Sequence, residues 1–96
     1  MAYAKKVVLH CTDGYRMRLD PLVEDFIRDG VIFVAVVGKG CAEVEDMIDE
    51  LVLGDDGTRE YHLLTSSHPN QSIQEAIEFA SSLTGEFSGP VQIVEL

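Results

Sequence analysis

The chain has 96 residues, of which 17 are acidic and 7 are basic, and its formal net charge is −10. This charge argues against nonspecific nucleic-acid binding, which needs Lys and Arg to replace phosphate counterions, and against binding to an anionic membrane surface. The hydrophobic share of 46% is that of an ordinary globular protein, and the length leaves room for one core, so we expect a single domain over residues 1–96.

The cellular location of the protein and its need for a cofactor or metal ion are predicted from sequence motifs that are missing. No signal peptide is predicted before the first apolar run, and the longest run, residues 31–37, is far shorter than the roughly 20 residues of a membrane helix. Two cysteines do not make a disulfide scaffold. We therefore expect a cytoplasmic protein. No cofactor or metal is expected, because dinucleotide, Walker and zinc-ligand patterns are missing.

The first half of the chain predicts two strands with a helix between them. Residues 5–12 form the first predicted strand. Asp20 is the predicted N-cap of the helix, with Pro21 at its first position, and Gly30 is the predicted stop. Residues 31–37 are apolar at every position, so we expect a second strand that is buried on both faces.

The second half predicts two further helices and two weaker strands. A helix over residues 41–53 places its apolar side chains on one face. Ser72 and Glu75 have the spacing of a capping box at the start of the third helix. Residues 61–66 and 91–96 are predicted strands, and the last one alternates enough to be an edge strand.

The alternation β-α-β-α-β-α-β predicts a three-layer α/β domain with a mostly parallel, four-stranded sheet. A flavodoxin-like or Rossmann-like strand order, 2-1-3-4, is the first expectation, and 1-2-3-4 or an order with strand two at the centre stays open. Residues 51–58 can be interpreted in two ways, as the end of the second helix with a loop after it or as a β-hairpin, because the turn residues at 54–57 fit both. The apolar stripe that begins at Val44 favours the helix.

Polar residues after the predicted strands are candidates for ligand binding, because open parallel sheets bind ligands at the carboxyl ends of their strands. The predicted ligand edge comprises Asp13, Arg16, Arg18, Lys39, Ser66 and Ser67. Gly38 and Gly40 predict a tight strand-to-helix turn rather than a phosphate loop. Residues 66–68 are interpreted as the beginning of a turn before Pro69.

Catalytic signals are weak and centre on Cys41, Cys11 and His68. Cys41 lies near the start of a predicted helix, where the positive end of the helix dipole favours a thiolate. Cys11 follows a buried strand and is interpreted as a packed side chain, and His68 is a candidate base. These residues define one alternative function, a small thiol-dependent enzyme or carrier, for which no complete motif is present.

Acidic residues cluster on the second predicted helix, opposite its apolar face. They are Glu43, Glu45, Asp46, Asp49 and Glu50. A surface of one charge steers and selects partners of the opposite charge. The sequence therefore predicts a non-catalytic binding or regulatory module that docks a basic protein on this face. A homo-oligomeric structural domain is a further alternative, so a homodimer stays open.

Overall fold

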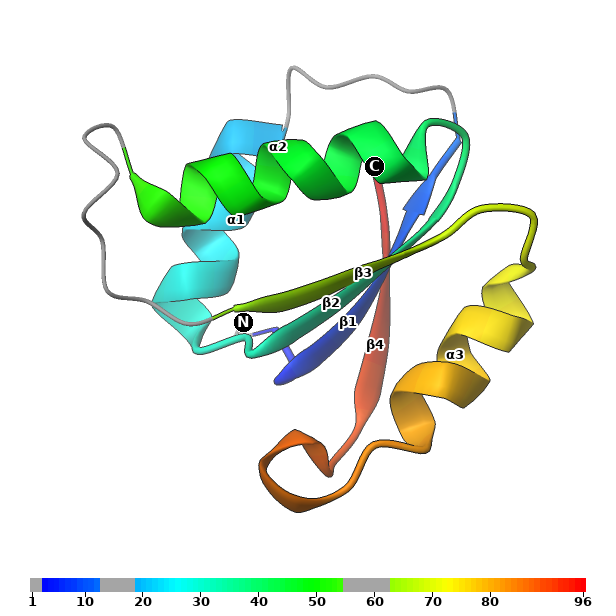
Figure 1. Ribbon diagram of the computed structural model, residues 1–96. Coiled ribbons are helices and arrows are strands. Elements are labelled where there is room, and N and C mark those ends of the chain that lie inside the picture. The colour runs from blue at the N-terminus through cyan, green and yellow to red at the C-terminus, as the bar shows by residue number, and fades with distance from the viewer. Residues whose placement is uncertain (1–2, 13–18, 55–62) are drawn as a thin grey trace.

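The computed structural model describes residues 3–12, 19–54 and 63–96. Within these ranges four strands alternate with three α-helices, which confirms the predicted α/β class (Figure 1). Their bounds are β1 Lys6–Cys11, α1 Leu19–Asp29, β2 Phe33–Gly38, α2 Cys41–Leu53, β3 Leu64–His68, α3 Ile73–Ser81, a single 3-10 turn η1 Gly85–Phe87, and β4 Val91–Glu95. No helix in the described ranges is long and apolar enough to cross a membrane.

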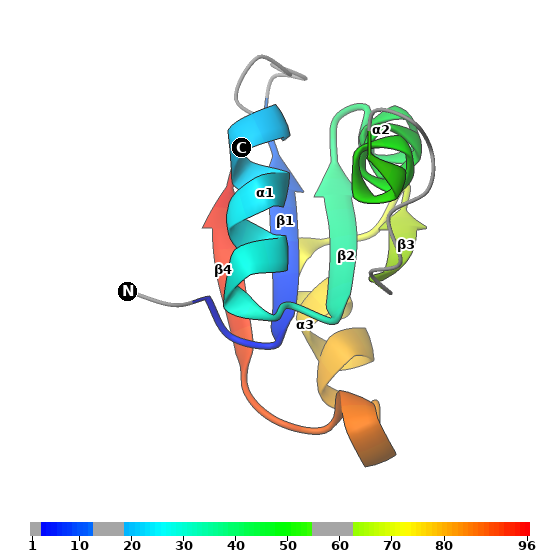
Figure 2. The same ribbon diagram turned by 90° about the vertical axis from the view of Figure 1, so that its left-hand side faces the viewer.

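The sheet is parallel throughout, and its strand order is β3-β2-β1-β4 (Figure 2). The first expectation, 2-1-3-4, is therefore wrong, and the alternative with strand two at the centre of the sheet is confirmed. β3 pairs with β2, from Leu64 opposite Phe33 to His68 opposite Val37, and not with β1. The physical reason is burial. β1 and β2 are buried along nearly their whole length and need a neighbour on each side, whereas the more polar β3 and β4 fit the edges, as expected for the last strand.

Helices α1 and α2 cover one face of the sheet and enclose the larger core. In Figure 2, α1 lies in front of β1 and α2 lies beside β3. Alternate residues of the two central strands point toward these helices, as the two-residue period of a strand requires. The buried side chains of this core are Val7, Leu9, Cys11, Leu19, Val23, Phe26, Val31, Val34, Val36, Cys41, Val44, Ile48, Val52 and Leu96.

Helix α3 alone covers the opposite face, among the residues that the structure describes. Ala76 and Ala80 let its backbone approach Val8 of β1 and Ala35 of β2 closely. With nine residues, α3 does not reach across four strands. Three large apolar side chains near its borders stay about half exposed: Leu64 at 51%, Phe79 at 43% and Ile93 at 47%.

Helix α1 begins earlier than the sequence indicates. Its first residue is Leu19, so Asp20 lies inside the first turn and is not the N-cap. Pro21 is still tolerated there, because the N–H groups of a first helical turn have no partner within the helix. The sequence missed this start because proline is compatible with more than one position of the first turn.

Two other predicted helix boundaries are confirmed. Gly30 ends α1 with a φ of 81°, and its N–H donates to the carbonyl oxygen of Ile27 at 3.2 Å. At the start of α3, the Ser72 N–H donates to Glu75 Oε1 at 2.9 Å, and the Glu75 N–H donates to Ser72 Oγ at 3.1 Å. This reciprocal pair is the capping box that the spacing predicts.

Strand β3 begins and ends later than the predicted 61–66. Residues 61 and 62 lie outside the described residues, and Ser67 and His68 belong to the strand. The interpretation of residues 66–68 as the beginning of a turn is therefore wrong. The turn consists of Pro69 and Asn70, and Asn70 has a φ of 66°. Pairing with the buried strand β2 overrides the local turn preference of serine.

The predicted strand-to-helix turn and the helix that follows it are both confirmed. Gly38 and Gly40 have φ values of 105° and 71°. A Cβ atom on Gly38 would overlap the carbonyl oxygen of Cys11, so glycine is required where the ends of β1 and β2 lie side by side. Helix α2 then continues to Leu53 without a hairpin, and Gly54 caps it; residues 55–62 lie outside the described residues.

Candidate functional site

A groove of about 350 Å³ lies between α1 and α2, on the outer side of the helical layer. Its apolar lining comes from Pro21 of α1 and from Met47 and Leu51 of α2, and Gly54 closes one end. The side chains of Met47 and Leu51 lie one helical turn apart, so they form a continuous apolar strip. The groove is therefore an apolar surface that solvent can reach.

Carboxylates surround this apolar strip. Asp20 and Glu24 come from the first two turns of α1, and Glu50 comes from α2. Among the described residues that line the groove, none is basic. A lysine or arginine side chain fits such a place well, because its methylene stem packs on apolar atoms while its charged end reaches carboxylates.

The five acidic residues predicted to bind a partner do not form one uniform face. Glu50 lines the groove, and Glu43 and Asp46 are exposed on the outer surface of α2. Glu45 and Asp49 face the sheet instead, where Thr65 Oγ1 lies 3.0 Å from Glu45 Oε2 and 2.7 Å from Asp49 Oδ1. The described residues contain no group of three His, Cys, Asp or Glu placed to hold a metal ion.

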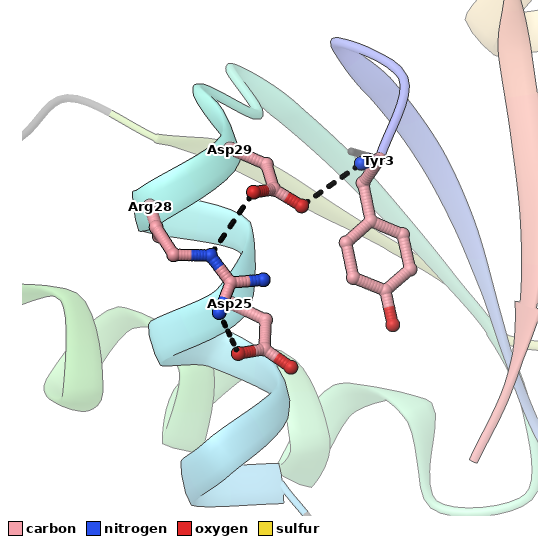
Figure 3. Close-up of polar contacts among 4 residues, drawn as sticks. All are labelled: Tyr3, Asp25, Arg28 and Asp29. Atoms are coloured by element: carbon pink, nitrogen blue, oxygen red, sulfur yellow. Dashed lines mark hydrogen bonds and ion pairs between the residues drawn. The ribbon is translucent and has the colours of Figure 1, made fainter. Parts of the chain in front are cut away.

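At the opposite end of α1, Arg28 lies between the carboxylates of Asp25 and Asp29 (Figure 3). Arg28 Nε donates to Asp29 Oδ1 at 3.1 Å, and its Nη1 lies 3.1 Å from Asp25 Oδ1. The backbone N–H of Tyr3 donates to Asp29 Oδ2 at 2.9 Å. This N–H, and after it Arg28, holds the pKa of Asp29 below its usual value, while Asp29 and then Asp25 raise the pKa of Arg28. Asp20 and Glu24, which line the groove, belong to the other end of α1.

The family model described as "Domain of unknown function (DUF7684)" matches residues 2–93. The chain belongs to that family. No curated protein and no solved structure matches it. The matched range includes both groove helices and all of β3, so the groove is part of the family's domain and not of an appended segment.

Only part of the predicted ligand edge of this family member is described. Asp13, Arg16 and Arg18 lie outside the described residues. Lys39 is exposed directly after β2, as expected. The two serines, Ser66 and Ser67, lie within β3 rather than after it.

The strand order places the topological switch between β1 and β4, where ligands of open α/β sheets bind. Polar contacts join the two strands there. His10 Nδ1 lies 3.0 Å from Glu95 Oε2, and Thr12 Oγ1 donates to the carbonyl oxygen of Leu96 at 3.4 Å. Sequence reasoning did not predict these contacts, because only the observed strand order brings β1 and β4 together.

Both cysteines are thiols packed in the larger core. Cys11 is 1% exposed and Cys41 is 3% exposed, and neither forms a disulfide. The register places Cys11 opposite Gly38, so β1 and β2 are adjacent at this end of the sheet. A nucleophilic thiol needs access to its substrate, which these two side chains lack.

His68 is held between two polar side chains on the α3 side of the sheet. Its Nε2 lies 2.8 Å from Ser66 Oγ, and its Nδ1 lies 2.8 Å from Gln71 Oε1. The ring of Phe79 packs against the imidazole, with ring centroids 4.9 Å apart. Sequence reasoning named His68 and Ser66 separately but missed their contact. The available signal was their i, i+2 spacing, which places both on one face of a strand.

Proposed function

We propose that this chain is a protein-binding module that docks a basic, amphipathic segment of a partner, without catalysis, in the groove between α1 and α2. The observation that carries the proposal is the combination of an apolar floor, Met47 and Leu51, with carboxylates from both helices. An apolar floor supplies contact area, and the surrounding charge selects the partner and orients it.

The outer surface of α2 extends the proposed interface. Leu53 is 50% exposed, and it lies one turn from Glu50 along the helix. Exposed apolar side chains within a charged surround are typical of interfaces, where they serve as anchors. Asp46 continues the acidic surface beside them. A basic amphipathic helix has the matching pattern, with leucine-like anchors and lysines on either side.

The two alternatives have less support. The burial of Cys11 and Cys41 disfavours a thiol-dependent enzyme. A homo-oligomer requires two chains of net charge −10 to approach each other, and their mutual repulsion opposes it. The cytoplasm is part of this proposal, because a sequence with two cysteines does not have the disulfide scaffold of small secreted domains.

The test uses a synthetic helical peptide of lysine and leucine residues, labelled for fluorescence anisotropy. Binding to the intact chain should weaken as the salt concentration rises from about 50 mM to about 300 mM, since the charges are exposed to solvent. Glu50→Gln should weaken it by about threefold, the contribution of one exposed ion pair.

The matched control is Glu78→Gln on α3, an exposed carboxylate on the other side of the sheet. Both variants change the net charge by one, so long-range attraction changes equally. Weaker binding for Glu50→Gln alone supports the groove. Equal losses for the two variants, or no binding of the peptide at low salt, contradict the proposal.

A further inference from the structure

The contacts of His68 have the arrangement of a nucleophile, a base and an orienting group. Gln71 Oε1, an acceptor, lies 2.8 Å from His68 Nδ1, so the tautomer that satisfies this contact is the one in which Nδ1 carries the proton. In the neutral imidazole, Nε2 is then the acceptor, and the Ser66 hydroxyl donates to it at 2.8 Å. A serine that donates to a base, which a third group orients, is the geometry that activates a hydroxyl nucleophile.

The packing of His68 fixes this geometry. His68 is 7% exposed, and Phe79 covers its ring. The register of β3 with β2 places Ser66 and His68 on the same face of the sheet, opposite Ala35 and Val37. Because the imidazole is enclosed and both of its nitrogens are engaged, it has little freedom to rotate away from Ser66.

The surroundings of Ser66 are apolar and open to solvent. Ser66 is partly exposed and lies between Leu64 and His68 along one face of β3. Leu64 is 51% exposed, and Phe79, which contacts His68, is 43% exposed. A molecule that approaches the Ser66 hydroxyl therefore meets apolar surface on two sides, which favours an acyl chain over a polar group.

We infer that Ser66 is a nucleophile, with His68 as its general base, that accepts the acyl group of carboxylic esters with an apolar acyl chain. Ser66 Oγ forms a bond to the carbonyl carbon, and its proton passes to His68 Nε2. The bond from that carbon to the leaving oxygen then breaks, and His68 returns the proton to the leaving alcohol. Water repeats the sequence, with His68 again as base, and releases the carboxylic acid and the free hydroxyl.

This activity is independent of the groove between α1 and α2, since β3 presents Ser66 to the α3 side of the sheet. Gln71 is a positioning residue, because it acts on the substrate only through His68. Two substitutions of Gln71 distinguish this positioning role from a purely structural one. Gln71→Glu keeps an oxygen acceptor for Nδ1, whereas Gln71→Ala removes it.

The test follows p-nitrophenolate release from p-nitrophenyl butanoate by the full chain, with intact folding of each variant checked by circular dichroism. We expect wild type to exceed Ser66→Ala by about 100-fold, the range of general-base catalysis. Ser67→Ala is the matched control, because Ser67 lies on the opposite face of the same strand and should retain the wild-type rate.

Two further measurements test the role of Gln71 and identify the residue that accepts the acyl group. Gln71→Ala should lower the release rate while Gln71→Glu retains it, although both variants alter the same turn. Butanoyl mass found on Ser66 after an acid quench identifies the acceptor. Equal release by wild type and Ser66→Ala overturns the inference, and so does a loss in Ser67→Ala as large as that in Ser66→Ala.

Discussion

The buried ammonium group of Lys6 binds the carboxyl end of α3 through the carbonyl oxygen of Ala80. The distance from Lys6 Nζ to that oxygen is 2.7 Å, and the lysine is 1% exposed. Helix α3 has no basic residue in its own last turn. Lys6 of β1 therefore supplies the positive charge that stabilises a helix C-terminus, and it fastens α3 to a central strand of the sheet.

Replacing Lys6 should remove a charged hydrogen bond and so lower the stability of the folded protein. Lys6→Met keeps the length of the side chain but leaves the Ala80 carbonyl without its donor, so we expect the free energy of unfolding to fall by about 1.5–3 kcal/mol. Urea unfolding measures the change. Lys5→Met is the matched control, because Lys5 is exposed and should change stability by less than about 0.5 kcal/mol. Equal effects at the two positions contradict the proposed role of Lys6.

Gly38 should tolerate no side chain. Its φ is 105°, and a Cβ atom would overlap the carbonyl oxygen of Cys11, a backbone atom at the end of the neighbouring strand β1. Gly38→Ala should therefore lower the free energy of unfolding by about 2–4 kcal/mol. Gly30→Ala has the conformational cost alone, since nothing lies within 4 Å of its Cβ position, and should lose about 1–2 kcal/mol. A loss at Gly30 that equals or exceeds the loss at Gly38 argues against the overlap.

Local signals identified the elements but not their neighbours. The seven apolar residues at 31–37 predict burial on both faces, and Ser72 with Glu75 predicts the start of α3, because each signal depends on residues close in sequence. Strand order depends on which strands need two neighbours. The predicted order placed β3 beside β1, whereas the structure has β3 at the edge of the sheet, beside β2. Such competition between strands is not visible in any one segment.

The functional groups were harder to predict than the fold. The acidity of α2 is visible in the sequence, but the groove also needs Asp20 and Glu24 from α1, which only packing brings close to Glu50. Lys6 shows the same limit, since nothing local distinguishes it from the exposed Lys5. Its burial follows from its position on the α3 face of a central strand.

The two thiols should react slowly in the folded protein. Cys11 and Cys41 lie in the core beneath α1 and α2, so a reagent reaches them only through opening of the structure. We expect alkylation by iodoacetamide to be about 100-fold slower than in urea for each cysteine, read separately by peptide mass spectrometry. Fast alkylation of either one in the native protein would restore the thiol-dependent enzyme as a leading alternative.

Asp29 should make the stability depend on pH in the acid range. The backbone N–H of Tyr3, and after it Arg28, lowers the pKa of Asp29 below its usual 3.8. Because the folded-state pKa is the lower one, the carboxylate's stabilisation is complete above the usual value and is lost as the pH falls through the folded value. Above about pH 5, the difference in unfolding free energy between wild type and Asp29→Asn should be constant, and it should shrink at lower pH.

Arg28→Gln separates the two causes of this pH dependence. The variant removes the guanidinium but leaves the Tyr3 N–H, which is the larger cause of the lowered pKa, so part of the acid-range dependence should persist. Urea unfolding of the three proteins between about pH 3 and pH 7 provides the comparison. If the dependence disappears in Arg28→Gln, the guanidinium and not the N-terminal backbone controls Asp29. A difference between wild type and Asp29→Asn that grows toward acid pH contradicts the lowered pKa itself, because a raised pKa gives that sign.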